Sequence, residues 1–236
     1  MKIVKILLLL IIAVSSACAN ASDEKISGDN QQEDSEIKYK RYGIESAIVE
    51  YTISGSRTGT EKLIFKDWGS KEAKYENAAM TMAGFSIAEN KLTIINGEST
   101  YNIDLEARTG TKIKTPFIEE MAEGAQTNDL TGIGERIMKS MGGKIIGQEE
   151  ILGKECDIWE IEMAGAKSWV WNWVTLKTEV NFLGTAIIIT AVSIDADVSI
   201  DNEEFEIPGD ITIGEKPELN SILNKLKGGF KKGTDN

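Results

Sequence analysis

The chain has 236 residues, of which 41% are hydrophobic, so one domain could bury a substantial core. Its 38 acidic residues outnumber 26 basic ones, which argues against nucleic acid as a partner, because binding to phosphates depends on Lys and Arg. The sequence contains no histidine, which excludes Ser-His-Asp and Cys-His catalysis and removes the commonest transition-metal ligand. We expect no metal and no cofactor.

The first segment, residues 1–19, has the form of an export signal. Lys2 and Lys5 precede an apolar run over residues 6–14, and the small residues 15–19 follow it. The run is too short for a membrane-spanning helix, which needs about 20 apolar residues. The sequence therefore predicts an exported protein.

Two cleavage sites stay open. Ala17-Cys18-Ala19 fits an ordinary signal-peptidase site and would release a soluble periplasmic chain. Alternatively, residues 15–18 resemble a bacterial lipobox, with Ser15 at the usual Leu position, and would make Cys18 the lipidated first residue of an outer-membrane lipoprotein. The polar linker 20–44 suits a membrane tether and favours lipidation, although a disordered N-terminus of a soluble protein would look the same.

Strands follow one another from residue 45 onward. Ala47, Val49, Tyr51 and Ile53 share one face while Glu50 and Thr52 point the other way, which is the period of a half-buried strand. The clearest turn is Asn96-Gly97, a pair that tolerates the positive φ angles of a tight hairpin.

The middle of the chain interrupts this pattern with two predicted helices. Pro116 opens a short helix that carries Met121. Asn128-Asp129 predicts the N-cap of a second helix, which carries Met138 and Met141 and ends at Gly142-Gly143. Gly132 and Gly134 weaken that helix by roughly 1 kcal/mol each relative to alanine.

Strands resume over residues 144–213. Residues 186–194 are apolar at nearly every position, which predicts a central strand covered on both faces. We therefore expect a β domain over residues 45–214, followed by a C-terminal amphipathic helix and tail over residues 215–236.

Tryptophans are concentrated in one short region. Trp169, Trp171 and Trp173 alternate, so they share one face if they belong to one strand. Such a surface is either ordinary core or the lining of a cavity for an apolar ligand, and flexible methionines suit the second interpretation. The candidate lipid-binding residues are Trp159, Trp169, Trp171, Trp173, Met121, Met138 and Met141.

Cys156 has no histidine or second cysteine beside it in the sequence, so we expect a buried, inert thiol. The acids at residues 195–201 mimic a calcium loop, but Ile200 occupies the position that requires glycine. No catalytic constellation is evident.

Four local patterns carry a resemblance to a known family. They are Gly59-x-x-x-Leu63-x-Phe65, Leu152-Gly153-Lys154-x-Cys156-x-x-Trp159, Trp171-x-Trp173-x-x-Leu176-Lys177 and Phe205-x-Ile207-Pro208. In this order the chain resembles the LolA and LolB type of lipoprotein carrier and its sorting-like relatives. The resemblance implies a mainly β fold, a curved and unclosed antiparallel sheet of about ten to eleven strands, a half-barrel whose concave face holds acyl chains beneath helices.

The departures from that family limit what transfers. Residues 34–43 are short and charged where the family has a long amphipathic helix, and the Pro and Arg after its early hairpin are missing. We therefore predict a non-enzymatic envelope protein that binds lipid or an acylated partner in an apolar cavity. A structural or adhesive surface module is the alternative, and an enzyme of unknown class is the third.

Overall fold

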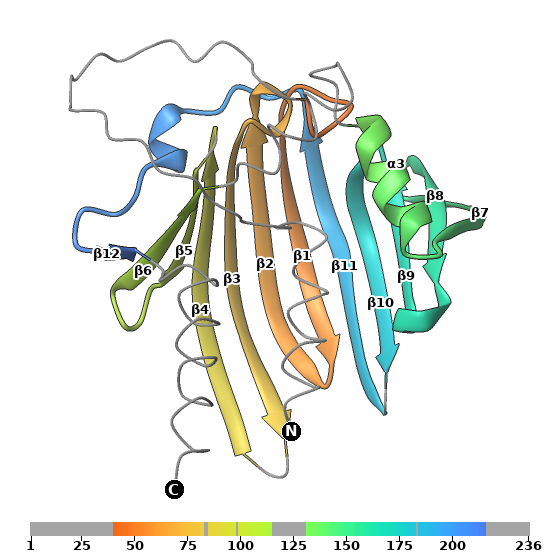
Figure 1. Cartoon of the computed structure of the whole chain (residues 1–236), viewed down its shortest axis with the longest axis horizontal. Coiled ribbons are helices and arrows are strands. Elements are labelled where there is room, and N and C mark those ends of the chain that lie inside the picture. The colour runs from red at the N-terminus through yellow and green to blue at the C-terminus, as the bar shows by residue number, and fades with distance from the viewer. Residues whose placement is uncertain (1–39, 83–84, 98, 115–130, 183, 216–236) are drawn as a thin grey trace, which may run out of the picture.

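The structure is a computed structural model that describes residues 40–82, 85–97, 99–114, 131–182 and 184–215 (Figure 1). One α-helix and three short 3-10 helices accompany the strands in this part of the chain. The helices are η1 (Asp67–Gly69), α3 (Thr131–Ser140), η2 (Glu162–Ala164) and η3 (Asn202–Phe205). The strands are β1 (Ala47–Gly55), β2 (Arg57–Lys66), β3 (Lys71–Met82), β4 (Phe85–Asn96), β5 (Ser99–Asp104), β6 (Thr109–Lys114), β7 (Lys144–Ile151), β8 (Lys154–Ile161), β9 (Ala166–Trp171), β10 (Val174–Phe182), β11 (Thr185–Ala196) and β12 (Thr212–Glu215).

All twelve described strands belong to one open sheet. Their order is β12-β6-β5-β4-β3-β2-β1-β11-β10-β9-β8-β7, and every pair is antiparallel except β12 with β6. The predicted mainly β fold with one unclosed antiparallel sheet is therefore confirmed. The sheet has slightly more strands than the sequence predicted, because β12 adds a parallel edge strand of four residues.

Short turns set the register of neighbouring strands. The predicted hairpin at Asn96-Gly97 is present, although Asn96 still pairs with Ser99 and Gly97 alone has a described positive φ of 56°. Leu152 and Gly153, with φ of 51° and 71°, connect β7 to β8. Two consecutive residues at positive φ match the right-handed twist of the flanking strands, so the hairpin closes tightly.

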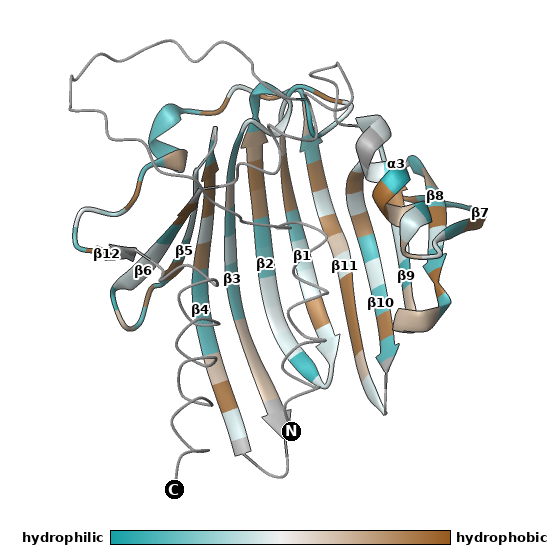
Figure 2. Ribbon diagram, viewed as in Figure 1, coloured by the Kyte–Doolittle hydropathy of each residue, from teal (hydrophilic) through white to brown (hydrophobic). Residues whose placement is uncertain are grey.

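Two apolar cores lie on opposite faces of the sheet. Val49, Leu63 and Phe65 belong to one core, whereas the intervening Ile64 belongs to the other. Successive side chains of a strand point to opposite faces, so the run Leu63–Phe65 is buried on both sides. This run is the brown upper part of β2 in Figure 2. The segment after β11 covers the core that contains Ile64, where Phe205 is buried. It then continues into β12 at the edge of the sheet.

The position of β11 corrects one expectation. It is a central strand between β1 and β10, as predicted. The prediction that both of its faces are covered was wrong, because Ile188 and Val192 are 36% and 52% exposed. A register shift in the β1–β11 pairing falls between Glu50 and Tyr51 on β1, opposite Val192. Hydrophobicity at consecutive positions therefore does not imply burial on both faces here.

Several predicted features lie outside the described residues. They are the signal at residues 1–19 with Cys18, the linker up to residue 39, the Met121 helix and the C-terminal helix from residue 216. The last residues of the predicted linker are described, and they pack on the sheet: Tyr42 and Ile44 contact the core that contains Phe65.

Candidate functional site

The helix α3 covers a small apolar cluster at one end of β8 and β9. We call this group the α3 cluster, and its members are Met138, Met141, Trp159, Ile161, Ala164, Val170 and Trp173. Met138 and Trp159 are 6% and 3% exposed, so they form its centre. Four of the seven residues that the sequence proposed for lipid binding meet here.

Close approach between α3 and the sheet depends on one glycine. A Cβ atom at Gly134 would lie 2.8 Å from the Trp173 ring, so only glycine allows this contact without displacement. The two glycines that weaken the helix therefore differ, because a Cβ atom at Gly132 would meet nothing within 4 Å. Glycine at position 134 lowers the helix propensity of α3, but it allows the helix backbone to pack directly against the Trp173 indole.

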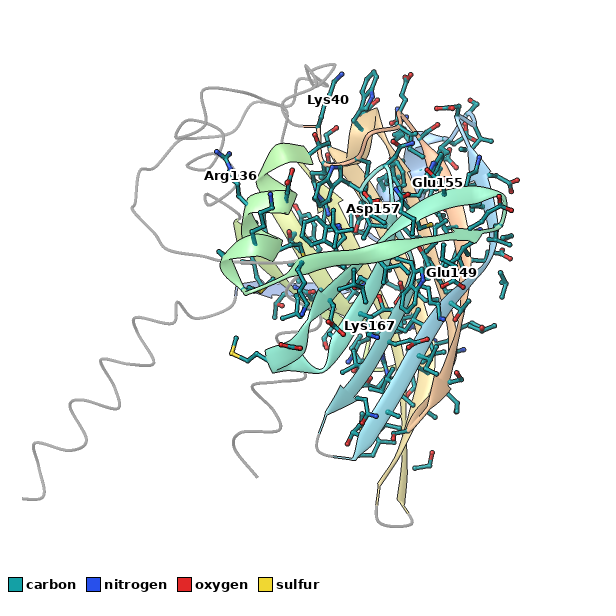
Figure 3. All side chains as sticks on the ribbon, turned by 90° about the vertical axis from the view of Figure 1, so that its right-hand side faces the viewer. Lys40, Arg136, Glu149, Glu155, Asp157 and Lys167 are labelled. Atoms are coloured by element: carbon teal, nitrogen blue, oxygen red, sulfur yellow. The ribbon has the colours of Figure 1, made fainter. Side chains whose placement is uncertain are left out.

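The end of α3 is also built by glycine. Gly142 has φ of 76°, and the Gly143 N–H donates to the Met138 carbonyl at 2.8 Å. This is the C-terminal cap that the sequence predicted from Gly142-Gly143. On the exposed side Lys139 pairs with Glu135 at 2.6 Å, and Arg136 projects away from the sheet (Figure 3). The helix is thus amphipathic, with its apolar side on the α3 cluster.

Trp173 does not belong to the strand that carries the other two alternating tryptophans. β9 ends at Trp171, which pairs with Val174, and Asn172 and Trp173 form the turn between them. Their φ angles are 47° and 64°, in the left-handed region that non-glycine residues rarely adopt. The condition for a shared face, that the three indoles belong to one strand, is therefore not met, because this turn reverses the chain without a glycine to mark it.

Trp169 and Trp171 lie on the other side of β9 from the α3 cluster. They pack against the core that contains Val174 and Cys156, whereas the intervening Val170 packs with α3. The Trp169 Nε1–H donates to Glu149 Oε2 at 2.6 Å. Lys177 Nζ lies 4.2 Å from the Trp169 ring centroid, and Lys154 Nζ lies 4.6 Å from that of Trp171. These polar and cation–π contacts hold both indoles in place.

A row of half-buried ion pairs on β2, β3 and β4 was not predicted from the sequence. Arg57 pairs with Glu76 and Glu89, and Lys74 lies 4.0 Å from Glu61. Within this row, Glu61 lies directly opposite the buried Tyr51 of β1. The sequence held one signal for this row. Arg57 and Glu61 are each an even number of residues from Leu63, so all three lie on the same face of β2.

This row shifts the ionisation of its members. Burial raises the pKa of Glu61, and Lys74 only partly offsets that effect. Glu89 is less enclosed, and although burial opposes the shift, Lys91 and Arg57 lower the pKa of its carboxyl. The carboxylates pair with the guanidinium of Arg57 and with the ammonium groups of Lys74 and Lys91, so the row is a connected network of ion pairs.

Cys156 is free and completely buried, as the sequence predicted. Burial raises the pKa of its thiol, and its Sγ–H donates to the Lys154 carbonyl at 3.4 Å. Both effects favour an unreactive thiol. Within the described ranges, no three His, Cys, Asp or Glu residues gather in a way that could hold a metal ion.

Comparisons with known proteins give fold likeness only. No family model and no curated protein matches the sequence. An uncharacterized conserved protein from Thermus thermophilus is similar in structure, with TM-score 0.47 and 7% identity over 74% of this chain and 93% of that chain. MucB gives TM-score 0.39 and 8% identity over 75% of this chain, which spans 62% of MucB. LprF from Mycobacterium bovis gives TM-score 0.31 and 12% identity over 69% and 90% of the two chains.

These likenesses are too remote to identify a function. The open antiparallel sheet agrees with the architecture that the lipoprotein-carrier resemblance implies, whereas membership of that family stays a prediction. In the part of the chain that the structure describes, no helix is long and apolar enough to cross a membrane.

Proposed function

We propose that this is a non-enzymatic bacterial envelope protein that binds an acyl chain, of a lipid or an acylated protein, between α3 and the β8–β9 end of the sheet. The observation that carries the proposal is the α3 cluster itself. A ten-residue helix meets two tryptophans through two methionines and one glycine. Methionine and indole surfaces adapt to apolar partners of varied shape.

The energetics of α3 favour exchange with a ligand. An isolated helix shorter than about 12–15 residues is marginal in water, so α3 depends on its contacts with the cluster. Met138 is its only described side chain that is fully buried. Each methylene of an acyl chain that replaces such contacts gains about 0.8 kcal/mol on burial, so a chain of several methylenes can compensate for displacing the helix.

The other tryptophan pair supports the rival hypothesis of a structural or adhesive module. Trp169 is 5% exposed and is hydrogen-bonded to Glu149, and Lys177 covers its ring. Displacing it would leave a carboxylate and an indole N–H without partners, which is costly. We therefore assign ligand binding to Trp159 and Trp173, and a permanent structural role to Trp169 and Trp171. Met121 remains a candidate from the sequence alone.

The site is tested by native mass spectrometry of the gently purified full chain, followed by tryptophan fluorescence during titration with dansyl-undecanoic acid. We expect copurified lipid and a saturable response. Trp173→Ala should abolish the saturable response, whereas Trp171→Ala, on the opposite side of β9, should retain it. An absence of both lipid and response in the unmodified chain would favour the structural module.

The location in the envelope is a second part of the proposal. Cys18, the small residues before it and the polar linker support a lipid-anchored outer-membrane protein over a soluble periplasmic one. Cys18→Ser should then release the protein from the membrane fraction. An intact mass that begins at Asn20 would instead establish ordinary signal-peptidase cleavage and a soluble product.

A further inference from the structure

Residues 41–43 form a short strap that crosses from η1 to the Trp173 turn. The Arg41 and Tyr42 N–H groups both donate to the Trp68 carbonyl, at 2.8 and 3.2 Å. The Gly43 N–H donates to the Asn172 carbonyl at 2.8 Å. The strap therefore connects the first described residues of the chain to a turn about 130 residues later in the sequence.

One end of the strap is fixed by a buried polar cluster. Arg41 lies 3.0 Å from Glu72 Oε2, and the Tyr42 hydroxyl donates to the same oxygen at 2.7 Å. Glu72 is 2% exposed, so removing Arg41 or Tyr42 would leave a buried side chain without one of its partners. Burial and the Glu72 carboxylate hold the pKa of Tyr42 well above its usual value, which keeps the hydroxyl protonated as a donor. The Tyr42 ring also packs on Phe65, with centroids 4.1 Å apart.

The other end of the strap contacts Asn172 closely. A Cβ atom at Gly43 would lie 3.2 Å from both the Cβ and the Oδ1 atom of Asn172. Asn172 and Trp173 both have left-handed backbones, which cost about 1–3 kcal/mol each at non-glycine residues unless the surroundings hold them. The hydrogen bond from Gly43 to the Asn172 carbonyl is one such restraint. Trp173 follows Asn172 in the chain, and its ring packs against Gly134 of α3.

We infer that Gly43 and Asn172 are positioning residues for the ligand site: the strap holds the turn in the conformation that presents Trp173 to α3. The ligand-binding part of this inference rests on the proposed function, whereas the control of α3 by the strap does not. The strap is also the point at which the predicted N-terminal tether joins the described sheet. The seating of α3 is thus linked to the segment that would connect the protein to a membrane.

The test is hydrogen exchange of the α3 amides in the full chain, measured for Gly43→Ala and for the double variant Gly43→Ala/Asn172→Gly. The added methyl pushes on Asn172, so we expect the Gly43→Ala protein to exchange its α3 amides about tenfold faster, with unchanged exchange in β1 and β2. Replacing Asn172 by glycine removes the side-chain atoms that the methyl meets and retains the carbonyl acceptor. The double variant should therefore return to the exchange rate of the unmodified chain.

A second variant tests the other end of the strap. Tyr42→Phe keeps the packing on Phe65 but loses the hydrogen bond to Glu72, so α3 exchange should rise by a smaller factor, about threefold. Unchanged α3 exchange in both Gly43→Ala and Tyr42→Phe would overturn the inference. A double variant as fast as Gly43→Ala would also overturn it, because Asn172→Gly removes the two side-chain atoms that the methyl group contacts.

The titration with dansyl-undecanoic acid separates this inference from the proposed function. If both hold, Gly43→Ala changes the dissociation constant several-fold and the double variant restores it. If the unmodified chain does not bind the probe but α3 exchange still follows the strap, the positioning role stands and the acyl-binding proposal fails.

Discussion

The two sides of β9 present indoles in opposite ways. On one side, Trp169 and Trp171 are held by a carboxylate and two lysines in a core that continues across six strands. On the other side, Trp159 and Trp173 have ring centroids 6.4 Å apart and are covered by a helix of ten residues. Burial of an indole therefore does not by itself indicate a function. The two sides differ in the number of contacts that must break before the ring is exposed.

The largest expected effect is on the fixed side. Trp169→Ala should lower the free energy of unfolding by about 3–5 kcal/mol, because it opens a cavity and leaves Glu149 without its donor. Urea denaturation measures this loss. Trp169→Phe, which keeps most of the ring volume, should cost clearly less. Equal losses in the two variants would mean that packing around Trp169 contributes little.

A smaller, local effect is expected on the covered side. Met138→Ala removes the buried side chain of α3 and should weaken the seating of the helix by about 2 kcal/mol. We expect α3 amides to exchange at least about tenfold faster while the urea midpoint of the sheet changes little. The exposed Lys139 provides a control through Lys139→Ala, which should leave both quantities unchanged. A midpoint that fell as far as in Trp169→Ala would show that the two sides unfold together.

The two glycines of α3 differ in what a methyl group would contact. Gly132→Ala should stabilise α3 by about 1 kcal/mol through helix propensity, because the methyl meets no other atom. Gly134→Ala gains the same propensity but drives a methyl into the Trp173 ring, so we expect a net loss of about 1 kcal/mol. Amide exchange of α3 measures both. If both substitutions stabilised α3 equally, the close contact between Gly134 and the Trp173 ring would be contradicted.

The smallest effect concerns the ion-pair row. Burial raises the folded-state pKa of Glu61 above its unfolded value. Protonation of this side chain therefore stabilises the folded protein at pH values below the unfolded pKa, and this stabilisation is lost as pH rises through the folded pKa. Glu61→Gln should remove this pH-dependent loss of stability. Urea midpoints of the variant and the unmodified chain, compared between about pH 4 and about pH 8, would detect the difference.

Glu89 is the matched control for that measurement. Although burial opposes the shift, Lys91 and Arg57 lower its pKa, so its contribution is present above the unfolded pKa and is lost as pH falls through the folded pKa. Glu89→Gln should therefore reduce stability near neutral pH, the opposite of Glu61→Gln. The same sign in both variants would contradict the assigned directions.

The local units of this fold could be predicted from short stretches of sequence. Alternation at residues 47–53 predicted β1, and the glycines at residues 97, 153 and 142–143 predicted two hairpins and the end of α3. These features depend on contacts between near neighbours and on backbone preferences, so they are legible in a few consecutive residues. The buried thiol of Cys156 was predicted because no histidine or second cysteine stands beside it in the sequence.

Which tryptophans meet depends on contacts between distant parts of the chain. Trp173 does not share a face with Trp169 and Trp171, because Asn172 and Trp173 adopt positive φ without glycine, a conformation that the contacts of Gly43 and Gly134 help to hold. The pairing of β1 with β11, and of Arg41 with Glu72, likewise joins residues far apart in the chain. Such contacts depend on the register of the whole sheet, because shifting a strand by one residue moves each of its side chains to the other face.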